Sequence, residues 1–228
     1  KIASNCLLAP DFSIRQLCIL CRADMLGRKC GDQKKMLEQI TLCETLAQDE
    51  GCFEGCFSFK SDAVRRIYLC GQDVWKEQGL YDDSWGEVVL MSGLPGTGKD
   101  TWIGNNLPDI PMISLDEIRK EQKISPKAEQ GYVASFAREQ AKEYLRRHQP
   151  FVWNATDITT QMRESLINLF ETYRARVRIV YLETDWNNLQ ARNSSREDAV
   201  PLKAIDNMLS KLTLPEAFEA RKVEWINV

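Results

Sequence analysis

Two hydrophobic patterns follow each other along the chain, and they meet near residue 87. In residues 1–70, apolar side chains recur every three or four positions, which is typical of amphipathic helices. Polar capping residues precede three such runs and predict helices from Ser13 to Met25, from Asp32 to about Gln48 and from Ser61 to Leu69. We therefore expect residues 1–70 to be wholly helical.

From residue 87 onward, short apolar runs alternate with longer amphipathic segments. Strands are predicted at 87–91, 110–114, 151–154, 176–182 and 222–227, and helices at about 99–106, 116–121, 126–148, 159–173, 185–196 and 201–212. Five strands separated by helices imply an α/β fold: a parallel five-stranded sheet with helices on both faces, preceded by a small all-α segment. Ligands bind such sheets at the carboxyl ends of the strands.

The composition supports a boundary between the two patterns. All eight cysteines fall within residues 1–70, and residues 71–86 are rich in Gly, Asp and Ser, as linkers are. We interpret the chain as a helical segment over 1–70, a linker over 71–86 and an α/β domain over 87–228. Because Lys1 leads directly into helix-like sequence without an initiator Met, we also expect the chain to be a piece of a longer protein.

The cysteine-rich segment allows three interpretations. Cys18 lies in an apolar helical run, where thiols behave as small hydrophobic side chains of a core. A zinc site built from Cys18, Cys21, Cys52 and Cys56 is the second interpretation, and disulfides are the third. We favour buried thiols, since a reducing intracellular compartment disfavours disulfides.

The charge balance restricts the classes of partner. The 228 residues carry a net charge of -3, and the pI is near 5.4. This balance disfavours a surface that coats nucleic acid non-specifically, although it is compatible with a local basic groove. No apolar run approaches the length that spans a bilayer, and no secretion signal begins the chain. We expect a soluble, cytoplasmic protein without a membrane partner.

The most informative motif directly follows the first predicted strand. It reads Gly93, Leu94, Pro95, Gly96, Thr97, Gly98, Lys99, Asp100 and Thr101, with a helix predicted behind it. Glycines let backbone N–H groups turn inward around a polyphosphate, the lysine supplies positive charge to the β- and γ-phosphates, and the helix N-terminus favours anions. A Gly-rich turn without a ligand is the alternative, but strand, loop and helix together predict a nucleoside triphosphate site.

One position departs from the usual phosphate-binding loop. Asp100 stands where Ser or Thr normally gives its hydroxyl to Mg²⁺. A carboxylate is also a hard oxygen ligand, so either Asp100 contacts the metal directly or through water, or Thr101 takes part. We expect Mg²⁺ beside the nucleotide and leave both arrangements open.

A second pair of candidate residues follows the second predicted strand. Asp116 and Arg119 begin a predicted helix, and their i to i+3 spacing places both side chains on one side of it. Beside a triphosphate, the carboxylate would accept the proton of an attacking hydroxyl, and the guanidinium would hold a substrate or transferring phosphate. The alternative is an acidic residue at a helix start and an unrelated surface arginine.

Two further arginines precede a polar loop after the fourth strand and its helix. Arg192 and Arg196 are four positions apart, and Pro201 marks the start of the next predicted helix. Such arginines could close over the phosphates as a lid and stabilise charge that develops in the transition state. A solvated, charged loop is the alternative interpretation.

These motifs, in this order, resemble the P-loop 5′-OH polynucleotide kinases. The matching segments are residues 93–99, the D-x-x-R of 116–119, the Asn-Ala-Thr-Asp of 154–157 and the R-N-x-x-R…V-P of 192–201, and the resemblance covers about residues 87–228. It implies transfer of the γ-phosphoryl group of ATP or another nucleoside triphosphate, with Mg²⁺, to the 5′-OH end of DNA or RNA in nucleic-acid repair.

The resemblance also implies a role for each matching residue. Lys99 would bind the phosphates, Asp116 would be the general base on the 5′-hydroxyl, and Arg119 would hold the acceptor-side phosphate. Arg192 and Arg196 would form the lid. The chain departs from the family pattern at two positions. One is Asp100, and the other is Ala155, a position at which phage-type members carry an acidic residue.

The helical segment carries a second resemblance. The stretch from Cys21 to Arg28 is similar to the last helix of HD phosphohydrolases, with Asp24 at the final metal-ligand position. This resemblance implies the kinase half of a bacterial HD-phosphoesterase/polynucleotide kinase, with other domains of a larger end-healing protein as partners. Since no His precedes His148, a phosphoesterase site cannot be complete in this chain.

Two other functions compete with the polynucleotide kinase. A small-molecule P-loop kinase, with a sugar or metabolite hydroxyl as acceptor, shares the loop and the aspartate after the second strand, and the acidic pI suits a small substrate. A non-catalytic nucleotide-binding switch is the third possibility, in which the cysteine-rich helices recruit a partner.

Overall fold

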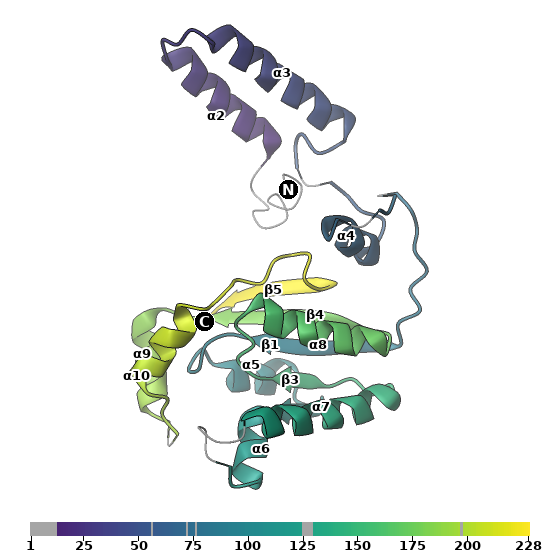
Figure 1. Cartoon of the computed structure of the whole chain (residues 1–228), viewed down its shortest axis with the longest axis vertical. Coiled ribbons are helices and arrows are strands. Elements are labelled where there is room, and N and C mark those ends of the chain that lie inside the picture. The colour runs from purple at the N-terminus through teal and green to yellow at the C-terminus, as the bar shows by residue number, and fades with distance from the viewer. Residues whose placement is uncertain (1–12, 56, 72, 76, 125–129, 197) are drawn as a thin grey trace. The chain divides into compact units, whose positions relative to one another are not determined.

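The structure, a computed structural model, describes residues 13–228 apart from 56, 72, 76, 125–129 and 197 (Figure 1). The chain divides into two units, Lys1–Leu80 and Tyr81–Val228. The predicted start of a helix at 126 and one cysteine of the proposed zinc set, Cys56, lie outside the described residues.

The described part of the first unit contains α2 (Ile14–Gly27), α3 (Gln33–Asp49) and α4 (Asp62–Leu69). Ser13 caps α2, since its hydroxyl accepts the backbone N–H of Gln16, whose side chain accepts the N–H of Ser13 in return. The three helices lie where the sequence predicts them, and the described residues of this unit contain no strand. Gly51, at φ 69°, follows the end of α3, and the described residues between it and α4 form turns and irregular backbone.

The packing of α2 against α3 partly supports the buried-thiol interpretation of the cysteines. Cys18 is buried with Ile14 and Ala47, and Cys43 and Cys52 pack against this small core. Burial raises the pKa of the Cys18 thiol to about 11, so this thiol stays protonated. Cys30 and Cys70, in contrast, are exposed. Among the described residues, no group of three or more His, Cys, Asp or Glu side chains is arranged to hold a metal ion.

The second unit is built on a five-stranded parallel sheet, as predicted. Its strands are β1 (Gly86–Ser92), β2 (Met112–Ser114), β3 (Val152–Asn154), β4 (Ala175–Glu183) and β5 (Lys222–Asn227), in the order β2-β3-β1-β4-β5. In register, Leu90 of β1 pairs with Trp153 on one side and Ile179 on the other. The central strand β1 therefore ends between β3 and β4, where its following loop meets the loops of both neighbours.

Helices cover both faces of this sheet, as also predicted. Along β1, Val88 and Leu90 face a core shared with α6 (Leu115–Glu121), α7 (Gln130–Arg146) and α8 (Thr160–Thr172). Val89 and Met91 face the opposite core, which includes Ile103 of α5 (Lys99–Asn106). This alternation follows from the two-residue period of a strand that is buried on both faces.

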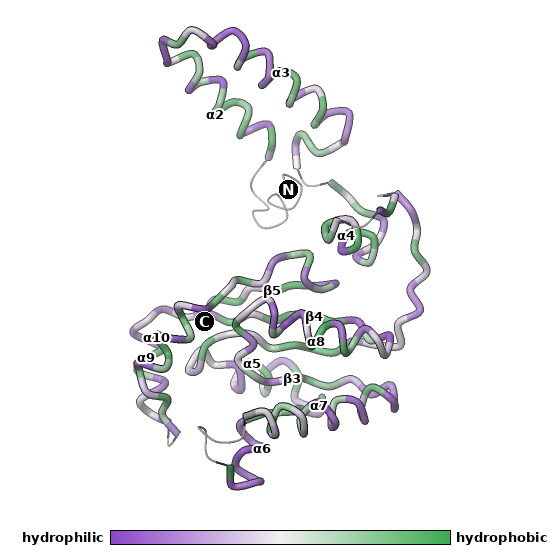
Figure 2. The backbone as a smooth tube through the Cα atoms, viewed as in Figure 1, coloured by the Kyte–Doolittle hydropathy of each residue, from purple (hydrophilic) through white to green (hydrophobic). Residues whose placement is uncertain are grey.

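Hydropathy along the backbone agrees with this layering. Figure 2 shows hydrophobic residues concentrated along the strands, whereas along α7 hydrophobic and hydrophilic residues alternate. No helix in the described part of the chain is both long enough and apolar enough to cross a membrane. The helices instead use one apolar side to cover the sheet.

At the carboxyl ends of the strands, α9 (Trp186–Ser194) and α10 (Leu202–Leu209) complete the unit. Leu94 and Ile158, from the loops after β1 and β3, pack with Leu189 of α9 and Ile205 of α10. This small core fixes α9 against the loop that follows β1. The last helix ends at Leu209 rather than at the predicted residue 212.

The start of the second unit is tied to the sheet by polar contacts. Trp85 donates its indole N–H to the carbonyl of Tyr173 at 2.8 Å, and Asp82 pairs with Arg221 at 2.9 Å. Residues 81–86, which the sequence assigns to the linker, thus pack against the α/β unit.

Candidate active site

The Gly-rich loop lies between β1 and α5, at the carboxyl edge of the sheet. Gly93, Gly96 and Gly98 have φ values of 142°, 86° and 90°, which other residues rarely adopt. At Gly93 a Cβ atom would lie 2.5 Å from the carbonyl oxygen of Leu182, so no side chain fits there. The curled backbone and the helix behind it have the form of a phosphate-binding loop.

Lys99, the first residue of α5, turns back across this loop. Its Nζ donates hydrogen bonds of 2.9 Å to the carbonyl oxygens of Gly93 and Leu94. Burial lowers the pKa of Lys99 to about 8, although the neighbouring carboxylates, Asp100 and Asp116 foremost, favour its charged form. The ammonium group is therefore a desolvated donor spanning the loop, and phosphate oxygens could take the place of the two carbonyls.

Asp116 and Arg119 lie on α6, directly after β2. The Ser114 hydroxyl caps this helix by accepting the backbone N–H of Glu117 at 3.3 Å. Arg119 Nη1 lies 2.6 Å from Asp116 Oδ1, so the prediction that both side chains share one side of the helix is correct. The Asp116 side chain is 71% exposed, whereas that of Arg119 is 21% exposed. The carboxylate thus faces solvent and is open to a substrate.

Arg192 and Arg196 both approach the Gly-rich loop. A Cβ atom at Gly98 would lie 3.3 Å from Arg192 Nη1, which places this guanidinium against the loop. Arg196 Nη2 lies 3.9 Å from Asp100 Oδ2. The structure therefore brings both predicted lid arginines to the residues that surround Lys99.

Asn193 anchors the segment that carries Arg196, and sequence reasoning missed it. Its side-chain amide donates to the Val200 carbonyl at 2.8 Å and accepts the Val200 N–H at 3.0 Å. The buried amide therefore ties Val200 to the end of α9. The sequence showed this asparagine only within the R-N-x-x-R motif of residues 192–196.

Asp100 and Thr101 occupy the first turn of α5. Asp100 accepts a 2.7 Å hydrogen bond from Asn154 Nδ2 at the end of β3, and its side chain is 69% exposed. Thr101 is exposed. Asp100 thus belongs to the same group as Lys99 and Arg196, at the junction between the phosphate-binding loop and β3.

Asp157 is the second residue at this edge that the sequence did not identify as part of the site. It is buried, has a φ of 35°, and accepts a 2.9 Å hydrogen bond from the indole N–H of Trp153. Burial raises its pKa to about 7, against the opposing influence of that hydrogen bond and of Lys99. The sequence showed this aspartate only within a family motif, because burial is not visible along the chain.

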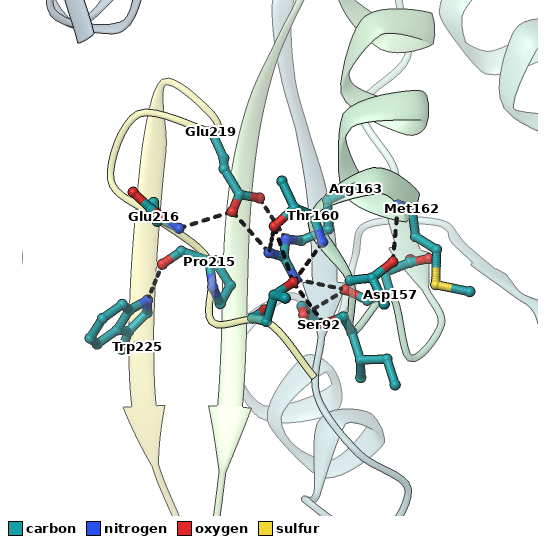
Figure 3. A network of polar contacts seen from close by, with 12 residues as sticks. Ser92, Asp157, Thr160, Met162, Arg163, Pro215, Glu216, Glu219 and Trp225 are labelled. Carbon is teal, nitrogen blue, oxygen red and sulfur yellow. Dashed lines mark hydrogen bonds and ion pairs between the residues drawn. The ribbon is translucent and has the colours of Figure 1, made fainter. Parts of the chain in front are cut away.

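Arg163 fixes the backbone around Asp157 (Figure 3). Its guanidinium is fully buried and pairs with both carboxylate oxygens of Glu219, at 2.6 and 2.8 Å. It also donates to the backbone carbonyls of Asp157 at 3.2 Å and Thr213 at 2.9 Å. The Ser92 hydroxyl at the end of β1 donates to the same Asp157 carbonyl at 2.9 Å. Arg163 thus joins β1, the loop after β3 and the segment before β5.

A parallel five-stranded sheet with a phosphate-binding loop after its central strand defines the chain as an α/β protein with the P-loop kinase fold. The family model described as "AAA domain" matches residues 88–215, more than half of the 228 residues. The chain belongs to this AAA domain family.

Solved structures with the same fold are distant in sequence. A candidate kinase from Chloroflexus aurantiacus is 14% identical, with a TM-score of 0.52, over 64% of this chain and 86% of that one. A chain of the Pnkp1/Rnl/Hen1 RNA repair complex is 15% identical, with a TM-score of 0.50, over 64% of this chain and 52% of that one. At such identities the likeness shows the fold alone.

Proposed function

We propose that this protein transfers the γ-phosphoryl group of ATP, or another nucleoside triphosphate, to the 5′-OH end of DNA or RNA. The observation that carries the proposal is a group of charged side chains at one edge of the sheet: Lys99 on the Gly-rich loop, the Asp116–Arg119 pair after β2, Arg192 against the loop and Arg196 beside Asp100. These are the charge types that phosphoryl transfer requires for positioning and for stabilising the transition state.

On the donor side, the loop from Gly93 to Thr101 would bind the triphosphate through its backbone N–H groups and Lys99. Mg²⁺ fits the residues present, because the exposed carboxylate of Asp100 is a hard oxygen ligand beside the loop and Asn154 orients it. When bound, the metal would neutralise charge on the transferred phosphate. Asp100 would hold it directly or through water.

On the acceptor side, Asp116 would take the proton of the 5′-hydroxyl as its oxygen attacks the γ-phosphorus. The bond between that phosphorus and the bridging oxygen breaks, and the nucleoside diphosphate leaves. Arg119 would bind the acceptor's phosphate. Because Arg119 contacts Asp116 in this structure, an acceptor phosphate that draws the guanidinium away would free the carboxylate to act as a base.

Arg192 and Arg196 would form the lid over the transferring phosphate. Arg192 lies against the loop, Arg196 lies beside Asp100, and Asn193, between them in the sequence, bonds to the backbone of Val200. Little movement is then needed to bring their charge onto the phosphate oxygens during transfer.

For the rest of the chain, we propose that residues 1–70 are the C-terminal remnant of an HD-like domain and that 71–86 link it to the kinase domain of a larger end-healing protein. The similarity of the segment around Asp24 supports this proposal. Asp24 itself pairs with Arg28 at 2.7 Å and belongs to no group of metal-ligating side chains among the described residues. A phosphoesterase activity is therefore not part of the proposal.

The test is transfer of label from γ-labelled ATP to a 5′-OH oligonucleotide, with the 5′-phosphorylated oligonucleotide as the matched control. Label on the 5′-OH strand alone is the expected result. Label on a sugar or metabolite but on neither strand would contradict the polynucleotide acceptor and favour a small-molecule kinase. Binding of ATP without transfer to any acceptor, in wild type and Asp116→Ala alike, would favour a nucleotide-binding switch.

A further inference from the structure

The contact between Asp100 and Asn154 differs from the usual metal side of a P-loop site. P-loop enzymes hold Mg²⁺ between a neutral hydroxyl, on the residue after the loop lysine, and a carboxylate at the end of the neighbouring strand. In this chain the residue after Lys99 is Asp100, and β3, the neighbour of β1, ends at Asn154. The charged and neutral groups have therefore changed places.

The surroundings hold each group in its new position. Asn154 is 6% exposed, and β3 aligns it with Ser114 of β2. Its Nδ2 reaches Asp100 Oδ1 at 2.7 Å and Met112 Sδ at 3.4 Å, so the amide is aimed at the carboxylate. Asp100 lies in the first turn of α5, where the helix dipole stabilises negative charge.

We propose that Asp100 and Asn154 have exchanged the metal-side roles, so that Asp100 holds Mg²⁺ and Asn154 orients Asp100. The inference rests on the proposed nucleotide site and adds a regulatory consequence to it. A fixed carboxylate on the phosphate-binding helix repels a polyphosphate that arrives without metal. With Mg²⁺ the same carboxylate attracts the complex, so nucleotide affinity depends on the metal more strongly than it would with a hydroxyl at this position.

Arg196 faces the same Asp100 carboxylate. The two side chains are 3.9 Å apart and are 38% and 69% exposed, which makes their attraction weak and readily exchanged. With Mg²⁺ bound, Asp100 would attract the Arg196 guanidinium less strongly, and the guanidinium would be free to contact the phosphate oxygens. The same carboxylate thus links metal binding to the position of the lid.

The experiment measures ADP affinity by calorimetry, in EDTA and in Mg²⁺, for wild type, Asp100→Ser and the double variant Asp100→Ser/Asn154→Asp. In wild type we expect Mg²⁺ to raise affinity by about 5–150-fold, the usual range for coupled sites. In Asp100→Ser, affinity in EDTA should rise and the Mg²⁺ effect should shrink at least fivefold. The double variant returns a carboxylate to the site at the end of β3 but keeps a hydroxyl at position 100, so the Mg²⁺ effect should return only in part.

Binding of Mn²⁺ to the ADP complex, followed by electron paramagnetic resonance, gives a readout of the metal itself and should change in parallel. Asp109→Ser removes an exposed carboxylate from the turn after α5 and should leave both readouts unchanged. Thermal unfolding of each variant confirms that it is folded.

Three outcomes would overturn the inference. A Mg²⁺ effect that Asp100→Ser leaves intact would remove Asp100 from the metal, with the nucleotide site still standing. Loss of the Mg²⁺ effect in Thr101→Ala rather than in Asp100→Ser would assign the metal to the hydroxyl of Thr101. No ADP binding to wild type in either buffer would contradict the proposed function as well.

Discussion

Arg119 Nη1 lies 2.6 Å from Asp116 Oδ1 across one turn of α6, and the carboxylate of this pair is the more exposed partner. Because the carboxylate is largely exposed, its attraction to the guanidinium is modest. In the proposed reaction, this contact would connect binding of the acceptor phosphate to release of Asp116 as the base.

Removing the carboxylate should separate catalysis from binding. We expect Asp116→Ala to lower turnover by about 10²–10⁴ while ADP affinity changes little, because a lost general base raises the barrier and leaves the phosphate contacts in place. Single-turnover label transfer and calorimetry measure the two effects. Glu117→Ala, an exposed carboxylate on the same turn, is the matched control. Equal losses of binding and turnover would assign Asp116 to the metal or to folding.

The lid is tested at Arg196. We expect Arg196→Ala to lower turnover by about 10³-fold and to weaken nucleotide binding much less, since the guanidinium gains its full contact only as charge moves onto the transferring phosphate. Arg196→Lys keeps the positive charge but loses the planar guanidinium. Turnover above that of Arg196→Ala would indicate that the charge alone stabilises the transition state, whereas equal turnover would indicate two paired hydrogen bonds to phosphate. Lys203→Ala, which removes an exposed cation from α10, is the control. Near-normal turnover of Arg196→Ala would contradict the lid and support a solvated, charged loop.

The buried pair of Arg163 and Glu219 should matter mainly for stability. Glu219→Gln leaves the fully buried guanidinium without its counter-charge, and we expect a loss of about 3–5 kcal/mol in the free energy of unfolding. Urea unfolding measures this loss. Arg163→Met/Glu219→Leu removes both charges and should cost less than the single change. A single variant as stable as wild type would show that the pair contributes nothing to the fold.

Asp157 predicts a specific dependence of stability on pH. Its pKa rises from 3.8 to about 7 on folding, because burial disfavours the charged form. The stabilisation by the bound proton is complete below pH 3.8 and is lost as the pH rises through about 7. Asp157→Asn has no such proton to lose. Its free energy of unfolding, relative to that of wild type, should therefore rise between pH 4 and 8, by at most about 4 kcal/mol. A stability difference that is constant from pH 5 to 8 in urea unfolding would contradict this account.

Lys99 predicts uptake of a proton when nucleotide binds. Its pKa of about 8 in the free protein means that much of the ammonium is deprotonated at pH 8.5, and phosphate would restore the proton. ADP affinity should therefore fall as the pH rises above about 8, by up to about tenfold per pH unit. Calorimetry at pH 8.5, in two buffers with different ionisation enthalpies, should give different heats for wild type and equal heats for Lys99→Ala. Equal heats for wild type would show that Lys99 stays charged.

The strands, the helices and the Gly-rich loop could be predicted because each depends on residues that are close together in the sequence. Val88 to Met91 read as a strand buried on both faces, and the glycines before Lys99 mark a loop that needs positive φ. The spacing of Asp116 and Arg119 placed them on one side of a helix, because a helix turns every 3.6 residues. These features depend on residues a few positions apart, so the sequence by itself determined the α/β class, the loop and the candidate pair.

The contacts that complete the site depend on the tertiary structure. Asn154 meets Asp100 across 54 positions, and Arg163 meets Glu219 across 56, and no periodicity connects such residues. Burial also decided the properties of single groups: the same aspartate side chain is exposed at Asp116 and buried, with a raised pKa, at Asp157. Hydrophobic spacing determines which segments form strands and helices, whereas desolvation and partner choice arise only when distant segments pack together at one edge of the sheet.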